Sequence, residues 1–148
     1  MTRRFTLALL LALVLPSCGD EPTLEQQIIG TINEMEQLAE EGKRGAFIDK
    51  VAGEFSGKLG LLSKDEFNRF MIMQWNRNNK LHAQLFPIAV RSLGPGMAAA
   101  DFNGLITGGR GLLPERGQLF HFETTWLEED GEWLLATANW EPVSMDAN

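Results

Sequence analysis

The sequence predicts an α+β domain in which three N-terminal helices pack on a curved antiparallel sheet of four strands. In the first half of the chain apolar residues recur at helical spacing, and in the second half they alternate with polar residues. Two such alternating segments flank Asp130-Gly131, which is the strongest short signal for a β-hairpin. A run of helices followed by antiparallel strands is typical of an α+β layer architecture.

The first helix is predicted to begin after Thr23, because Thr23-Leu24-Glu25-Gln26 is a capping-box pattern. Apolar residues then follow at helical spacing until Gly42, which is expected to end the helix. A second, shorter helix is predicted over residues 44–55, although Gly53 weakens its end. The apolar positions of these two helices are Leu24, Ile28, Ile32, Met35 and Leu38, then Phe47, Ile48 and Val51.

The third helix is predicted from a second capping box, Ser63-Lys64-Asp65-Glu66, which places acidic residues in the first turn, where the helix dipole favours them. The helix is expected to stop near Asn78-Asn79. Its amphipathic face comprises Phe67, Phe70, Met71, Gln74 and Trp75.

Four strands are predicted in the second half, over residues 82–93, 97–106, 118–127 and 132–140. Gly94-Pro95-Gly96 forms a turn between the first two strands. The third strand alternates cleanly, with His121, Glu123 and Thr125 on one face. The opposite face, which is expected to pack inward, carries Phe120, Phe122, Thr124 and Trp126.

A short leader precedes this domain. Arg3 and Arg4 are followed by an apolar run over residues 5–15, which is too short to span a bilayer. The leader ends in Leu15-Pro16-Ser17-Cys18, which resembles the lipobox of bacterial lipoproteins, and this resemblance implies that Cys18 is acylated. The alternative is ordinary secretion, with cleavage at Ser17-Cys18-Gly19.

The lipoprotein interpretation divides the chain into a signal peptide (1–17), a lipidated cysteine with a short tether (18–22), one domain (23–143) and a C-terminal tail (144–148). The anchor implies a location at the bacterial cell envelope. Gly19, rather than aspartate, follows Cys18. By resemblance to Gram-negative sorting rules, this favours the outer membrane, with the domain facing the periplasm.

The net charge of the chain indicates which classes of molecule it is not expected to bind. The sequence has 13 basic and 20 acidic residues, a formal net charge of −7, and the predicted leader contains two of the arginines. Such an excess of negative charge disfavours nucleic acid as a partner. Cys18 is the only cysteine, so no disulfide can form within the chain, and stability must come from its core.

The order of elements resembles the nuclear transport factor 2-like superfamily, the SnoaL-like, cystatin-like cone. The matching features are the long first helix, the segment Ile88 to Ala100 with its turn at Gly94, and the ending from Trp126 through Trp133 to Trp140. The superfamily includes isomerases, dehydratases, cyclases and proteins without catalytic activity, so the resemblance implies a shape rather than a reaction. It also raises the alternative of a homodimer formed through the outer sheet face.

Candidate site residues come from the predicted sheet and its aromatic side chains. His121 and Glu123 share a strand face, and Asp101 begins a neighbouring strand; a histidine beside a carboxylate is suited to general acid-base catalysis. The alternative for this pair is the solvent-exposed side of a half-buried strand. Trp75, Trp126 and Trp140 are candidates to line a pocket for a flat apolar ligand, or else to fill the core.

Neither a metal nor a cofactor is expected. His82 and His121 are far apart in the sequence, and no metal-binding motif surrounds them. The isomerases of the superfamily are expected to use a tyrosine in their oxyanion site, and this chain has no tyrosine. The sequence therefore predicts a non-catalytic, lipid-anchored domain that binds a protein partner or a small apolar ligand. The alternative is an isomerase-like or dehydratase-like enzyme with a histidine-carboxylate pair in its pocket.

Overall fold

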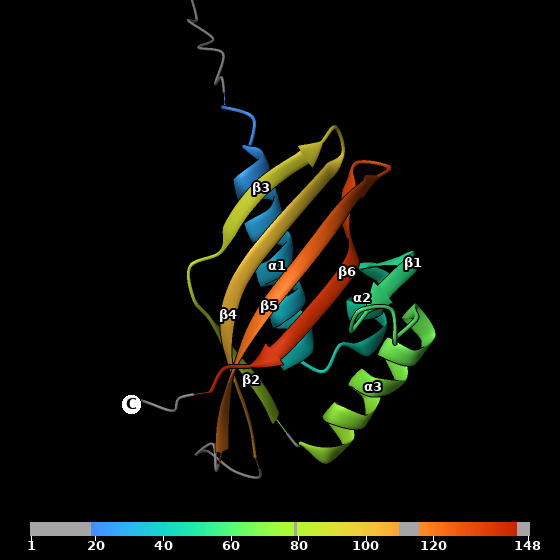
Figure 1. Ribbon diagram of the computed structural model, residues 1–148, viewed down its shortest axis with the longest axis vertical. Helices are drawn as coiled ribbons and strands as arrows, with labels where there is room; N and C mark the ends of the chain where they lie inside the picture. Colours follow the sequence, from blue (N-terminus) through green and yellow to red (C-terminus); the bar gives the residue numbers. More distant parts are fainter. Residues whose placement is uncertain (1–18, 79, 110–115, 145–148) are drawn as a thin grey trace, which may run out of the picture.

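The computed structural model of this chain describes residues 19–78, 80–109 and 116–144 (Figure 1). The leader with Cys18, and the end of the predicted C-terminal tail, lie outside the described residues. None of the described helices is both long and apolar enough to cross a membrane. The helices are α1 (Leu24–Glu40), α2 (Arg44–Asp49) and α3 (Lys64–Arg77), and the strands are β1 (Val51–Gly57), β2 (Lys80–Leu85), β3 (Ala89–Gly94), β4 (Met97–Gly109), β5 (Arg116–Glu129) and β6 (Glu132–Pro142).

Both predicted capping boxes are present. At the start of α1, the Gln26 backbone N–H donates to the Thr23 hydroxyl (3.2 Å), and the Thr23 N–H donates to the Gln26 side chain (2.9 Å). Ser63 and Glu66 make the same reciprocal pair at α3. After α1, Gly42 adopts φ +66°, a left-handed conformation that ends the helix as its position predicts.

The described strands form one curved sheet in the order β1-β6-β5-β4-β2, and β3 also pairs with β4. Helix α1 lies across one face of this sheet, and α3 lies beside β1 (Figure 1). Strands β5 and β6 form the predicted hairpin, in which Asp130 and Gly131 both have positive φ, as a type I′ turn requires. The predicted α+β class, with helices on a curved sheet, is therefore confirmed.

The sheet has six strands in the described residues rather than the four predicted. The helix predicted over 44–55 ends at Asp49, and the residues after it form β1, which pairs in parallel with β6. This strand buries Val51 and Phe55, and the Leu135 N–H donates to the Lys50 carbonyl (2.8 Å) where β1 begins. Helical spacing in so short a segment is ambiguous, and pairing with β6 decides its conformation.

The strand predicted over 82–93 is also two strands. β2 pairs with the second half of β4 and β3 with its first half, and Pro87 lies between them. Proline has no N–H to donate to a ladder, so pairing along β4 is interrupted there.

Candidate functional site

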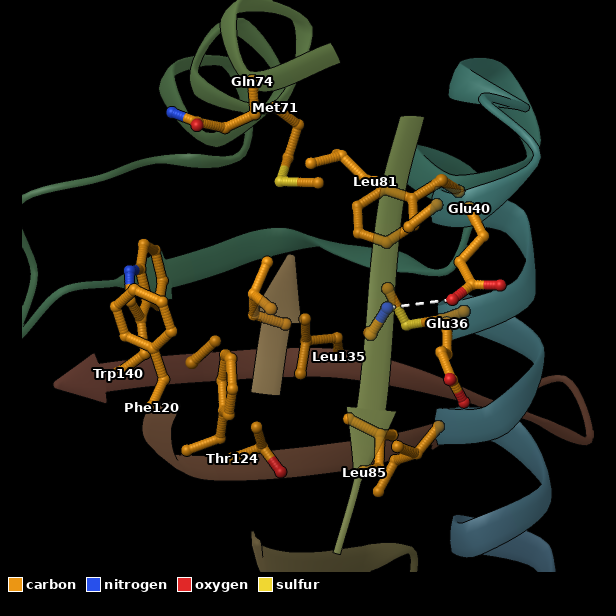
Figure 2. Close-up of a pocket in the computed structure, with 18 of the residues that line it drawn as sticks. Glu36, Glu40, Met71, Gln74, Leu81, Leu85, Phe120, Thr124, Leu135 and Trp140 are labelled. Carbon is orange, nitrogen blue, oxygen red and sulfur yellow. Dashed lines mark hydrogen bonds between the residues drawn. The ribbon is translucent and has the colours of Figure 1, made fainter. Parts of the chain in front are cut away.

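A cavity of about 280 Å³ lies between the concave face of the sheet and the helices (Figure 2). All three helices and four of the strands contribute to its lining, which is mostly aliphatic and aromatic. Apolar cavities with a few polar groups are typical small-molecule sites, and this volume lies just below the usual ~300–1,000 Å³. The cavity is therefore the candidate functional site.

The inner face of β5 forms the floor of this pocket. Phe120, Phe122, Thr124 and Trp126 alternate along the strand and all line the cavity, on the face that their spacing predicts. The Thr124 hydroxyl donates to the Ala100 carbonyl (2.8 Å) and accepts from Trp126 Nε1 (2.9 Å). Because these buried polar groups satisfy one another, the floor presents apolar surface to a ligand.

Gly104 of β4 makes room for this floor. A Cβ atom at this position would lie 3.0 Å from Cε2 of Phe122 and 3.2 Å from Cδ2 of Leu85, and both side chains line the cavity. These contacts are tighter than ordinary van der Waals packing, so any larger residue would push the two side chains out of place.

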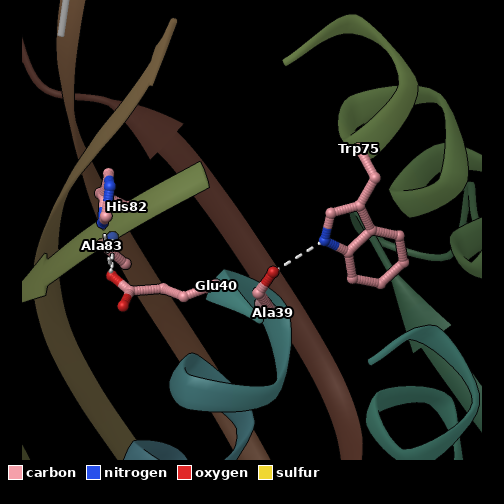
Figure 3. Close-up of polar contacts among 5 residues, drawn as sticks. All are labelled: Ala39, Glu40, Trp75, His82 and Ala83. Carbon is pink, nitrogen blue, oxygen red and sulfur yellow. Dashed lines mark hydrogen bonds and ion pairs between the residues drawn. The ribbon is translucent and has the colours of Figure 1, made fainter. Parts of the chain in front are cut away.

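The three candidate tryptophans occupy different positions. Trp126 and Trp140 line the cavity, whereas Trp75 does not. Trp75 is buried edge-on against Phe47, with ring centroids 5.6 Å apart, and its Nε1 donates to the Ala39 carbonyl (2.8 Å; Figure 3). Trp75 therefore ties α3 to the C-terminal end of α1 and helps to hold the pocket wall in place.

Glu36, Glu40 and His82 form an acidic rim on one side of the cavity. The two glutamates lie one turn apart on α1, on the side that faces β2 (Figure 2). Glu40 Oε1 accepts from the Ala83 N–H of β2 (2.9 Å) and lies 3.5 Å from His82 Nδ1 (Figure 3). The Glu40 and His82 side chains are 32% and 62% exposed, so this rim is in contact with solvent.

Glu36 has an unusual environment for a carboxyl group. Partial burial beside the cavity, and secondly the nearby charge of Glu40, raise the pKa of Glu36 above its ordinary value. The rim therefore contains a carboxyl group that holds its proton more tightly than usual.

Glu36 and Glu40 were not among the site residues predicted from the sequence. Their spacing of four residues, next to the buried Ile32 and Met35, was the available signal. This spacing alone does not indicate a pocket, because glutamates on a helix are most often solvent-exposed. It becomes informative only once β2 is known to lie against α1.

The candidate catalytic residues lie on the other face of the sheet. His121 and Glu123 alternate with the floor residues of β5, and both are exposed. Asp101 is the cross-strand partner of Glu123, and His121 Nδ1 lies 2.9 Å from Asn103 Oδ1. The structure thus brings these residues together, but on the outer face rather than in the pocket. Within the described ranges, no three His, Cys, Asp or Glu side chains are grouped to hold a metal ion.

No family model matches the sequence, and no curated protein matches it. Solved structures do resemble the fold. Aln2 from a Streptomyces species has a TM-score of 0.71 at 12% identity, over 83% of this chain and 93% of its own.

Two further structures resemble it to a similar degree. An NTF2-like protein of unknown function from Pseudomonas putida has a TM-score of 0.69 at 16% identity, with 82% and 89% of the two chains covered. A candidate scytalone dehydratase from Novosphingobium aromaticivorans has a TM-score of 0.69 at 9% identity, with 81% and 84% covered. At such identities the likeness concerns the fold alone. The described chain therefore has the nuclear transport factor 2-like fold, a cystatin-like cone.

Proposed function

We propose that this protein is a lipid-anchored domain of the bacterial cell envelope that binds a small, largely apolar ligand in its cone without catalysing a reaction. The observation that carries the binding role is the cavity of about 280 Å³ with its aromatic floor. Burial of apolar ligand surface there would contribute roughly 25 cal/mol per Å² before the costs of association. The protein partner considered from the sequence is the less favoured occupant, because a concave pocket suits a small molecule.

Ligand binding is tested with a variant that fills the cavity. Figure 2 shows the Met71 side chain extending from α3 toward Leu81, so a tryptophan at position 71 should occupy ligand space. Calorimetric titration of the full chain with 1-naphthalenemethanol, a neutral apolar probe, should give saturable binding that Met71→Trp weakens by at least about tenfold.

Met73→Trp is the matched control. Met73 lies on the same helix but is 40% exposed and does not line the cavity, so this variant should bind the probe as the unaltered protein does. Equal affinity in all three proteins would show that the probe does not enter the cavity. Circular dichroism of each variant checks that the helices are retained.

The anchoring part of the proposal rests on Leu15-Pro16-Ser17-Cys18. Two or more acyl chains hold a protein stably on a membrane, where a single chain does not. Cys18→Ser should therefore move the protein from the membrane fraction to the soluble fraction, and separation of inner from outer membranes tests the proposed outer-membrane location. Intact mass without added lipid would contradict the anchor.

The acidic rim favours a second candidate function, an enzyme that uses a carboxyl group as general base. A carboxyl group whose pKa is raised is better matched to proton transfer near neutral pH, and Glu36 has such a pKa. The likeness to a candidate dehydratase agrees with this option. Turnover of any compound in a metabolite screen that Glu36→Gln abolishes, with binding retained, would favour the enzyme over the binding protein.

Two expectations about partners stay predictions. A homodimer would use the outer sheet face, and light scattering that finds only a monomer would contradict it. The acidic composition predicts no binding to nucleic acid, which a gel-shift experiment at low salt would test.

A further inference from the structure

The polar side chains at the edge of the cavity are Glu36 and Glu40 on α1, His82 on β2 and the amide of Gln74 on α3. Among the described residues, no hydrogen bond or ion pair reaches either carboxyl oxygen of Glu36, and none reaches Oε2 of Glu40. The Thr124 hydroxyl inside the cavity is already occupied by two partners. A ligand in the apolar part of the pocket would therefore meet unmatched carboxyl oxygens on the side of the pocket that α1 forms.

Acidic residues elsewhere near the end of α1 are neutralised within the protein. Glu34 pairs with Lys50 (3.0 Å), and Glu41 pairs with Lys43. Glu36 and Glu40 face the cavity instead, and the only basic group that the described residues place beside them is His82, on Glu40. Of the four glutamates between positions 34 and 41, the two without a lysine partner among the described residues are therefore the two that line the pocket.

The two rim carboxylates also act against each other. Like charges four residues apart on a helix destabilise it, and part of the shift at Glu36 comes from Glu40. A cation between these carboxylates and the cavity would relieve that repulsion and would replace the hydration that Glu36 loses by burial. An ammonium group has donors and no acceptors, so it matches the unmatched oxygens.

We infer that the ligand of this pocket is an amphiphilic amine, whose apolar body fills the cavity and whose protonated nitrogen lies at Glu36 and Glu40. This inference rests on the proposed ligand-binding function and specifies its chemical class. A divalent metal ion fits less well, because the described residues provide no cluster of three metal-ligating side chains there. The acidic chain would also attract a cationic ligand and repel an anionic one.

The test uses three probes with one ring system and different charge: 1-naphthylmethylamine, 1-naphthalenemethanol and 1-naphthoate. In calorimetric titrations of the full chain near pH 7, we expect the amine to bind about tenfold more tightly than the alcohol, since one hydrogen bond to a charged group is worth about that factor. The carboxylate should bind most weakly.

The variants Glu36→Gln and Glu40→Gln each keep the shape of the side chain, and glutamine at position 40 can still accept from the Ala83 N–H. Each should reduce the affinity for the amine by about tenfold and leave the affinity for the alcohol unchanged. Glu34→Gln removes the same charge from α1 at a position outside the pocket, so it should leave all three affinities unchanged.

The outcomes separate this inference from the function on which it rests. If the alcohol binds the unaltered protein as tightly as the amine does, the pocket binds apolar ligands but the amine assignment is wrong. If the preference for the amine survives in the Glu36→Gln/Glu40→Gln double variant, the rim does not cause it, and the assignment is again wrong. If none of the three probes binds, both the inference and the proposed function fail.

Discussion

The two faces of β5 differ in both packing and chemistry, although their residues alternate along one strand. On the inner face Phe122 and Trp126 form the pocket floor, and Trp126 is 2% exposed. On the outer face His121 and Glu123 are exposed beside polar cross-strand neighbours. A histidine two residues from a glutamate looks like catalytic machinery in the sequence, yet the pleat directs both away from the cavity. The acidic rim of the pocket comes instead from α1 and β2.

The largest expected difference between the two faces is in stability. Trp126→Ala should lower the free energy of unfolding by about 3–5 kcal/mol, because it leaves a cavity and removes the hydrogen bond to Thr124. His121→Ala on the outer face should change it by no more than about 0.5 kcal/mol. Denaturant unfolding of both variants measures the difference, and equal losses would contradict the assignment of faces.

Gly104→Val should have the next largest effect, a loss of about 1–3 kcal/mol from overpacking against Phe122 and Leu85. The same variant should weaken binding of the neutral naphthalene probe, because both displaced side chains line the cavity. Asn103→Val changes the adjacent, outward-facing position and serves as the control. Unchanged stability and binding in Gly104→Val would mean that the floor has more free space than the structure shows.

A smaller effect is expected within the outer face itself. The Thr125 and Thr137 hydroxyl groups lie 2.7 Å apart across β5 and β6. Thr125→Val removes this cross-strand pair at little change of shape and should cost about 0.2–1 kcal/mol in unfolding free energy. A loss as large as that of Trp126→Ala would show that the outer face contributes more to stability than its exposure implies.

The smallest expected effect is that of Glu36→Gln on the pH dependence of stability. The folded state raises the pKa of Glu36 above its ordinary value of 4.5, so the proton is held more tightly in the folded than in the unfolded protein. The contribution of Glu36 to stability is therefore lost as the pH rises from about 4.5 through the folded-state pKa, and it is fully present below 4.5.

Glutamine at position 36 does not ionise, so this variant should be slightly more stable than the unaltered protein near neutral pH, with the gain shrinking to nothing in acid. Thermal unfolding at several pH values measures this trend. A Glu36→Gln protein that is less stable at neutral pH would contradict the destabilising environment that the structure indicates for this carboxyl group.

Much of the fold could be predicted because its signals are local. The capping boxes at Thr23 and Ser63, the turn at Asp130-Gly131 and the alternation of β5 each depend on neighbours within a few residues. The predicted helix over 44–55 and the predicted single strand over 82–93 were wrong because both depend on pairing with distant segments. β1 is a strand because β6 lies beside it, and the pairing along β4 is interrupted at Pro87.

The candidate site likewise has one part that could be predicted from the sequence and one part that could not. Alternation along the strand predicted which side of β5 faces inward, because side-chain direction follows from the backbone alone. Which polar groups reach the pocket depended on the packing of α1 against β2, which brings Glu40 to the Ala83 N–H across 43 residues of chain. Local residue patterns thus determined the secondary structure and its buried faces. Only the tertiary structure decided which residues form the acidic rim, because a contact between two distant segments produces no periodic pattern in the sequence of either segment.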